Sequence, residues 1–139
     1  MVILDTNVVS ELMDAEPDAI VINWLDGQSW MSLWTTSVTV MEIRYGLAIM
    51  PAGRRRTERQ AAFARLIEET FERRVLFFDH AAAEEAASLM GARYRAGRPG
   101  ELRDTMIAGI ALAQRATLAT RNLRHFDDLS VPVVDPWRR

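Results

Sequence analysis

Four side chains with oxygen donors stand where an expected strand ends or an expected helix begins. They are Asp5 after an apolar strand, Glu42 about one turn into a helix, Asp104 in the first turn of another helix, and Asn122 after a later strand. Three carboxylates and one amide are hard oxygen ligands, which suit Mg²⁺ or Mn²⁺. Ligands of open α/β sheets bind beyond the carboxyl ends of the strands, so the fold would bring these four together. The pattern predicts a divalent-metal site.

Each of these residues also has a purely structural interpretation. Asp5 could cap the helix that follows it, Glu42 could edge a solvated face, Asp104 could serve the helix dipole, and Asn122 could be a turn residue. Taken singly, the structural role is favoured for each. Their shared placement favours a site, because clustered like charges need a cation to offset their repulsion.

The residue types that are missing narrow the chemistry further. The 139 residues include 17 Arg, no Lys, no Cys and only two His, His80 and His125. This excludes a P-loop lysine, a Schiff-base lysine, a thiol nucleophile, any Cys-containing zinc site and a three-His metal site. Carboxylates, hydroxyls, amides and Arg must therefore do the chemistry.

The net charge of −2 conceals an uneven distribution. Residues 1–43 carry seven acids and no Arg, whereas every Arg lies within 44–139. An acidic site beside a basic surface suits an enzyme that acts on a polyanion. Codon usage in a GC-rich genome is an alternative cause of the missing Lys, but it does not explain the asymmetry.

Two groups of Arg are candidates for phosphate contacts, because guanidinium groups bind phosphate bidentately. The group at the start of a basic helix has a solvated face as its alternative. The groups are Arg54, Arg55, Arg56 and Arg59, and then Arg121 and Arg124 beside Asn122. The hydroxyl of Thr6 lies next to Asp5 and could assist it. We assign Met41, Met50, Trp24, Trp30 and Trp34 to the core or an interface rather than to base stacking.

Apolar periodicity predicts strands that alternate with helices. We expect strands at 2–4, 31–35, 75–78, 117–120 and 131–134, and helices at 8–13, 17–26, 37–50, 54–73, 81–95 and 102–116, with breaks at 51–53 and 96–100. This order favours a three-layer α/β/α fold with a central, mostly parallel sheet of about five strands. The length favours one domain over 1–139. With no signal-peptide pattern and no apolar run of membrane-spanning length, we expect a cytoplasmic protein.

The residues singled out above, with the segments around them, show a family resemblance. The chain resembles the PIN-domain ribonucleases, and within them the VapC toxins of type II toxin–antitoxin operons, including their FitB-like branch. The matching segments cover essentially the whole chain in order: Met1-Val2-Ile3-Leu4-Asp5-Thr6-Asn7-Val8, Thr39-Val40-Met41-Glu42-Ile43-Arg44-Tyr45-Gly46, Asp104-Thr105-Met106-Ile107-Ala108, Ala119-Thr120-Arg121-Asn122 and the C-terminal Val131-Pro132-Val133-Val134-Asp135-Pro136-Trp137.

The resemblance implies a divalent-metal-dependent endoribonuclease that uses Mg²⁺, with Mn²⁺ as an alternative. Carried over from the family, Asp5 and Asp104 are the metal ligands, Glu42 completes the acidic cluster, and Asn122 occupies a fourth position that is a carboxylate in some members. Many relatives have Asp before the Phe of the same loop, where this chain has His125. Asp127, two residues later, could substitute for that Asp in part.

The resemblance also implies partners: an RNA substrate, a VapB-type antitoxin protein, a second copy of the chain in a homodimer, and operator DNA only through the antitoxin. Two alternatives stay open at this point, a PIN-fold binding module with weakened catalysis and a nuclease that acts on DNA. Three other folds are disfavoured: a receiver domain needs a Lys, a haloacid-dehalogenase-type phosphatase needs Asp where Asn7 stands, and a Rossmann module needs a Gly-rich turn after its first strand.

Overall fold

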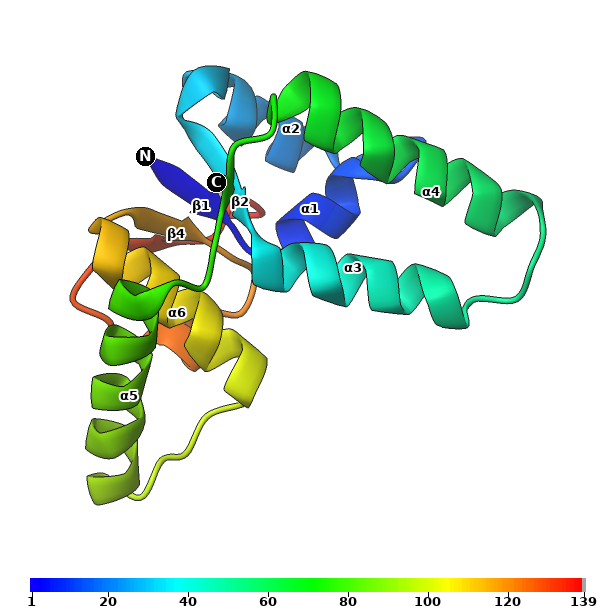
Figure 1. Cartoon of the computed structure of the whole chain (residues 1–139). Helices are drawn as coiled ribbons and strands as arrows, with labels where there is room; N and C mark the ends of the chain where they lie inside the picture. The colour runs from blue at the N-terminus through cyan, green and yellow to red at the C-terminus, as the bar shows by residue number, and fades with distance from the viewer. Residues whose placement is uncertain (139) are drawn as a thin grey trace.

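The computed structural model describes residues 1–138, and a parallel sheet of five strands forms its centre (Figure 1). The strand order is β3–β2–β1–β4–β5, and each neighbouring pair is parallel. The strands are β1 Val2–Leu4, β2 Leu33–Thr36, β3 Val75–Leu76, β4 Thr117–Ala119 and β5 Val133–Val134. The predicted α/β class and parallel sheet are therefore confirmed.

Helices cover both faces of this sheet, which gives three layers. They are α1 Thr6–Leu12, α2 Ala19–Asp26, α3 Ser37–Ile49, α4 Arg54–Arg65, α5 His80–Arg95 and α6 Leu102–Gln114. Because side chains alternate along a strand, Leu4 packs with α1–α4 on one face while the preceding Ile3 packs with α5 and α6 on the other. In Figure 1, α3 and α4 project from the sheet as a hairpin, on the side away from α5.

Short polar side chains begin these helices, as the sequence predicts. Asp5 caps α1 through a 2.8 Å hydrogen bond from the backbone N–H of Thr6, and Thr36 caps α3 through a 3.1 Å bond from that of Thr39. Each cap satisfies a backbone donor that the first helical turn leaves free. The chain therefore turns directly from the end of β1 and of β2 into a helix, which places those strand ends beside helix starts.

The structure corrects the expected helix over 54–73. Helix α4 ends at Arg65 and continues as a π-helical turn over Leu66–Thr70, in which the N–H of Phe71 bonds the carbonyl of Leu66 at 2.8 Å. Phe71, which follows this wider turn, is fully buried in the core. The next two residues, Glu72 and Arg73, have positive φ angles of 46° and 61°, which reverse the chain into β3.

Several strands are shorter than expected. The segment 30–32 forms a 3₁₀ turn, so the second strand begins at Leu33. The third strand stops at Leu76, which pairs with Thr36, the last residue of β2, and Phe77 after it is 71% exposed. The fifth covers Val133–Val134 alone. A further 3₁₀ turn, Leu123–Phe126, follows Asn122. Within residues 1–138, no helix combines the length and the apolar character that crossing a membrane requires.

The close packing of α5 against α6 depends on a glycine. A Cβ atom on Gly109 of α6 would lie 2.5 Å from the carbonyl oxygen of Ala82 and 2.8 Å from the Cβ of Ala86, both on α5. Gly46, inside α3, has no heavy atom within 4 Å of the same position. The two glycines share helical backbone and differ in the space around them.

We therefore expect Gly109→Ala to lower the free energy of unfolding by about 1–3 kcal/mol, because α5 must move away from α6. Gly46→Ala is the matched control, in which the better helix propensity of Ala acts without a clash. Urea unfolding followed by circular dichroism measures both. Equal effects of the two substitutions would contradict close α5–α6 packing.

Candidate functional site

The predicted site residues meet at the point where the strand order reverses. From β1 the chain places β2 and β3 on one side and β4 and β5 on the other, so a crevice opens beyond the carboxyl ends of β1 and β4. A cavity of about 470 Å³ lies there. All four side chains predicted from the sequence line it, together with neighbours from α1, α3 and α4: Asp5, Glu42, Asp104 and Asn122, with Thr6, Asn7, Ser10, Met13, Ile43, Gly46, Leu47, Met50 and Arg59.

Asp5 is the most deeply buried of the acids, with 3% of its surface exposed. Its Oδ2 accepts a 2.7 Å hydrogen bond from the hydroxyl of Thr120, and Oδ1 accepts the capping bond from Thr6. The pKa of Asp5 is raised to about 6, mainly by burial and to a lesser extent by the charges of Asp104 and Glu42, against the lowering effect of those hydrogen bonds. Asp5 thus both caps α1 and faces the acidic cavity.

Glu42 reaches the cavity from the second turn of α3. The hydroxyl of Thr6 donates a 2.9 Å hydrogen bond to its Oε1, and that hydroxyl also lies 3.0 Å from the one of Thr39. Burial raises the pKa of Glu42, while the Thr6 hydrogen bond and the cation of Arg103, 3.9 Å from Oε2, lower it. Thr6 therefore contacts both acids, Glu42 through its hydroxyl and Asp5 through its backbone N–H.

Asp104 lies in the first turn of α6 and is one-fifth exposed. Its backbone N–H is capped by the carboxylate of Glu101 at 2.9 Å, which fixes the start of the helix. Its Oδ2 lies 3.0 Å from Nδ1 of His125, the residue that precedes Phe126 in the 3₁₀ turn Leu123–Phe126. Asn122 is exposed, and its backbone N–H donates to the hydroxyl of Thr120, the same group that holds Asp5.

The donor set fits a hard divalent cation, because the polar side chains that face one another here offer carboxylate, amide and hydroxyl oxygens. In the described residues 1–138, however, no three Asp, Glu or His side chains lie close enough to hold an ion by themselves. Each carboxylate is instead turned toward a hydrogen-bond donor of the protein.

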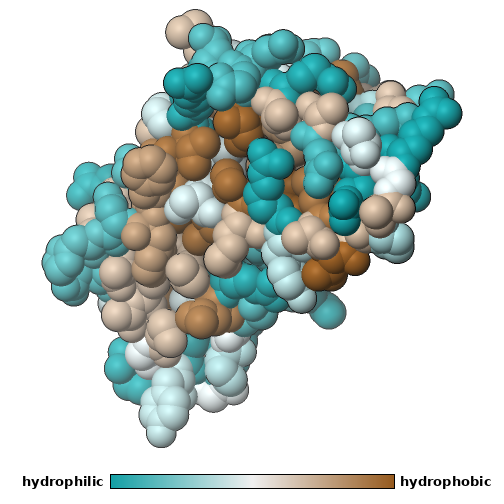
Figure 2. Space-filling model, turned by 45° about the vertical axis from the view of Figure 1, so that its right-hand side comes forward, coloured by the Kyte–Doolittle hydropathy of each residue, from teal (hydrophilic) through white to brown (hydrophobic). Residues whose placement is uncertain are grey.

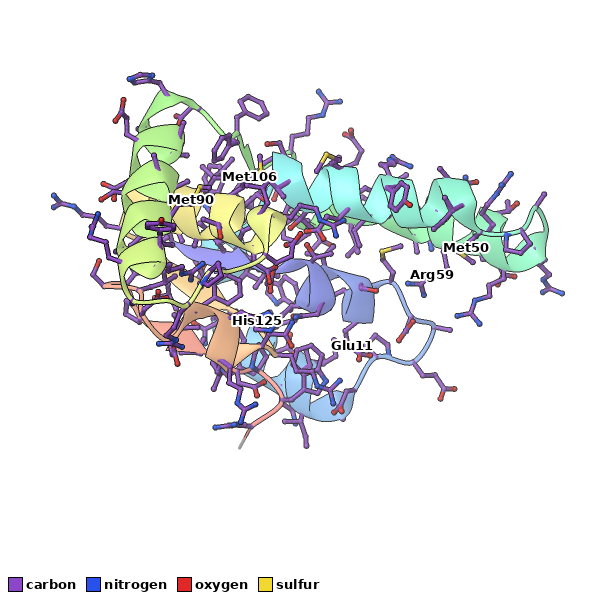
Figure 3. The ribbon with its side chains drawn as sticks, turned by 90° about the horizontal axis from the view of Figure 1, so that it is seen from below. Glu11, Met50, Arg59, Met90, Met106 and His125 are labelled. Atoms are coloured by element: carbon purple, nitrogen blue, oxygen red, sulfur yellow. The ribbon has the colours of Figure 1, made fainter. Side chains whose placement is uncertain are left out.

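The Arg candidates for phosphate contacts differ in their position relative to the cavity and in their exposure. Arg59 lines the cavity, donates to Asp14 at 2.8 Å and is only one-fifth exposed, whereas Arg54 pairs with Glu58 on the solvated face of α4. Arg56 donates to the carbonyl of Met50 at 3.1 Å. Figure 3 shows Arg59 near Met50, at the α3–α4 end of the molecule and away from His125.

The remaining expected contacts lie outside this cavity. Arg121 stacks over the ring of Trp137 at 4.8 Å, and Arg124 lines a separate cavity beyond His125. Asp127 lines that second cavity too, which Asp104 also borders, and it pairs with Arg98 at 3.2 Å. It does not line the cavity that holds Asp5. Trp24, Trp30, Trp34 and Met50 pack against the core, as assigned from the sequence, whereas Met41 is half exposed.

Sequence reasoning did not select Thr120, Arg103 or Arg93, which all contact the site or its neighbours. Thr120 follows β4 directly, so its position at the same strand edge as Asp5 was the available signal. The contact of Arg103 with Glu42 joins α6 to α3 and has no local signature. Arg93 is a buried cation in the last turn of α5, a position where a solvated Arg is also common, so no periodic pattern distinguishes the two.

The chain is similar to known proteins over nearly its whole length. The family described as PIN domain matches residues 2–131. The chain is 39% identical over 137 residues to the VapC ribonuclease Y4jK of Sinorhizobium fredii, covering 99% of this chain and 98% of that protein. It is 31% identical to the toxin FitB of Neisseria gonorrhoeae, over 99% of each. The solved structure of FitAB bound to an IR36 DNA fragment superposes with a TM-score of 0.89 at 30% identity, covering 100% of this chain and 97% of that one.

The raised pKa of Asp5 has a measurable consequence for stability. Its folded pKa of about 6 exceeds the ordinary value of 3.8, so the folded state binds the proton more tightly than the unfolded chain does. The resulting stabilisation is complete below pH 4 and is lost as the pH rises through about 6. At pH 8 the charged carboxylate therefore destabilises the fold.

We expect Asp5→Asn to raise the free energy of unfolding by roughly 1–3 kcal/mol at pH 8 in chelator, and to have little effect at pH 4. Asn retains the capping preference of Asp, so α1 keeps its start. Glu85→Gln, on the exposed face of α5, makes the same charge change as a control. Denaturant unfolding at both pH values provides the comparison, and a gain that persists at pH 4 would contradict the assigned pKa.

Proposed function

The chain belongs to the PIN domain family, and on that premise we propose that it is a divalent-metal-dependent endoribonuclease acting as the toxin of a VapBC-type toxin–antitoxin pair. The family resemblance expected from the sequence is confirmed, and so is the three-layer α/β/α PIN-like fold. We further propose that residues 1–139 form a single PIN domain, since the family match and the full-length relatives extend over nearly all of them.

One observation carries the catalytic proposal: Asp5, Glu42 and Asp104 line a single cavity at the switch point of the sheet, next to the amide of Asn122. Separate strands and helices supply these acids, so no single helix cap or solvated face explains their meeting. Bringing like charges together costs free energy, and a bound cation repays it. We assign Asp5 and Asp104 as the metal ligands, with Mg²⁺ as the expected ion and Mn²⁺ as a substitute.

A divalent cation, when bound, supplies positive charge that stabilises the anion formed as the phosphodiester is cleaved. Glu42 is the group placed to orient the attacking water and to accept its proton at a carboxylate oxygen. Burial raises the pKa of Glu42, which makes it a stronger base than a solvated Glu. As water adds to phosphorus, the bond to one ribose oxygen breaks, and that oxygen takes a proton from solvent. Asn122 donates a hydrogen bond toward the phosphate or the water from the exposed rim.

Partners follow from the same proposal. Several neighbours are solved as toxin–antitoxin complexes, and FitAB and the VapBC of Salmonella typhimurium are solved with DNA. We propose that this chain likewise pairs with an antitoxin protein, contacts operator DNA only through it, forms a homodimer, and meets its RNA in the cytoplasm. A small reading frame beside its gene, encoding a DNA-binding segment, is the expected source of that antitoxin.

The direct test is cleavage of RNA by purified protein in Mg²⁺. We expect Asp5→Asn and Asp104→Asn to reduce the rate by about 100-fold or more, because each removes a charge that the bound cation needs. Glu85→Gln should retain the rate, since it lies on α5 away from the cavity. Excess chelator should abolish cleavage by the wild type.

The substrate is tested in the same assay with DNA of the matching sequence. Cleavage of DNA alone would replace RNA as the substrate. Wild-type activity in either Asp variant, or in chelator, would contradict the metal-dependent mechanism. Absence of cleavage by the wild type in Mg²⁺ would instead leave a binding module.

Arg59 provides a second prediction, because it is the candidate from the basic helix that lines the cavity. We expect Arg59→Gln to weaken RNA binding several-fold and to flatten its dependence on salt concentration by about one charge. Arg54→Gln is the matched control, on the same helix but paired with Glu58 in solvent. Filter binding of the Asp5→Asn variant over a salt series measures both without cleavage, and equal slopes would exclude Arg59 from the contact.

A further inference from the structure

Arg93 is a buried cation that the catalytic site does not use directly. It lies on α5 with 6% of its side chain exposed. Its Nε and Nη2 donate to the two carboxylate oxygens of Asp128 at 2.8 and 2.9 Å. A guanidinium that is removed from water is stable only when its donors are satisfied, and this bidentate geometry satisfies them well. Besides these bonds to Asp128, the guanidinium of Arg93 contacts two further segments.

The other donors of Arg93 reach the two segments that flank the proposed metal ligand. Nη1 donates to the hydroxyl of Thr105 at 3.0 Å, and Thr105 directly follows Asp104 in α6. Nη2 donates to the backbone carbonyl of His125 at 2.9 Å, and the ring of His125 contacts Asp104. Arg93 thus fixes the helix that carries Asp104 and the 3₁₀ turn whose side chain touches it.

The loop before α6 is shaped around this guanidinium. A Cβ atom on Gly100 would lie 2.5 Å from Nη1 of Arg93 and 3.5 Å from the hydroxyl of Thr105. Gly100 therefore leaves room for the Arg93–Thr105 contact at the start of α6. Thr105 also donates from its hydroxyl to the carbonyl of Glu101 at 2.9 Å, so the same network extends to the residue that caps the N–H of Asp104.

We propose that Arg93 is a positioning residue for the metal site: it holds the His125 turn and the first turn of α6 in register, so that the His125 ring orients the Asp104 carboxylate toward the cavity. This inference rests on the proposed function, in which Asp104 is a metal ligand. Hydrogen bonds to a ligating carboxylate tune metal affinity, typically by 10- to 100-fold. Arg93 acts one step further away, through the main chain of the residue that makes such a bond.

The nearby pair Arg98–Asp127 provides the comparison. It joins the same loop to the same turn, yet its side chains are 63% and 52% exposed and its contact involves neither His125 nor Thr105. Exposed pairs of this kind contribute little to stability. Arg98→Gln therefore removes a cation beside the turn without altering the network that holds Asp104.

The experiment measures Mn²⁺ affinity by titration calorimetry on the folded protein, with circular dichroism as a check on structure. We expect Arg93→Lys to weaken Mn²⁺ binding by about 10-fold, because Lys cannot bond Asp128, Thr105 and His125 together. Arg98→Gln should bind Mn²⁺ as the wild type does. Asp128→Asn, which keeps the guanidinium in place but weakens its bidentate partner, is the second variant if Arg93→Lys does not fold.

A double-mutant cycle with His125→Ala separates positioning from general destabilisation. That substitution removes the ring contact with Asp104 but keeps the carbonyl that Arg93 binds. If Arg93 acts through the ring, Arg93→Lys should cost little further affinity once His125 is Ala. Two losses that multiply, or an Arg93→Lys variant with wild-type affinity, would overturn the inference. A wild type that neither binds Mn²⁺ nor cleaves RNA would instead refute the proposed function itself.

Discussion

The site depends on one unfavourable burial: a carboxylate, Asp5, placed at the junction of the two central strands. The parallel pairing of β1 with β4 brings Thr120 beside Asp5, and the turn into α1 supplies the N–H of Thr6. These donors stabilise the carboxylate without neutralising it, so its charge remains available to a cation. Because burial raises the pKa of Asp5 to about 6, a positive charge near this carboxylate would stabilise its ionised form.

Neutral hydroxyl donors, more than cations, organise the acids around this point. Thr6 holds Glu42, Thr120 holds Asp5, and the nearest cation to Glu42 is 3.9 Å away on Arg103. A tight ion pair at each carboxylate would have neutralised the acids of the cavity from within the protein. On the face drawn in Figure 2, hydrophobic residues gather into patches bordered by hydrophilic ones.

In the fold, the acidic and the basic parts of the sequence contribute different groups to the cavity. The acidic first segment contributes Asp5 and Glu42, and the basic remainder contributes Asp104 together with Arg59 and Arg103 at the margins of the cavity. Arg93 also belongs to this basic part of the sequence, but it is buried inside the protein. There it bonds Asp128 and the carbonyl of His125 and so holds a turn, and it is not exposed to a polyanion. Charge composition therefore indicated an acidic centre correctly, but it did not distinguish Arg that meet solvent from Arg that build the site.

The sequence by itself determined the alternation of strands and helices, the helix starts at Asp5 and Thr36, and the meeting of four oxygen donors, because these follow from local periodicity, capping and the rule that parallel strands share an edge. Only the tertiary structure decided where α4 ends, since the π-helical turn at Leu66–Thr70 and the burial of Phe71 after it have no signature in the apolar periodicity. It also decided that Asp127 faces Arg98 rather than the cavity. His125 and Arg93 gain their roles from contacts with residues 21 and 32 positions away, and no local pattern encodes a partner at that separation.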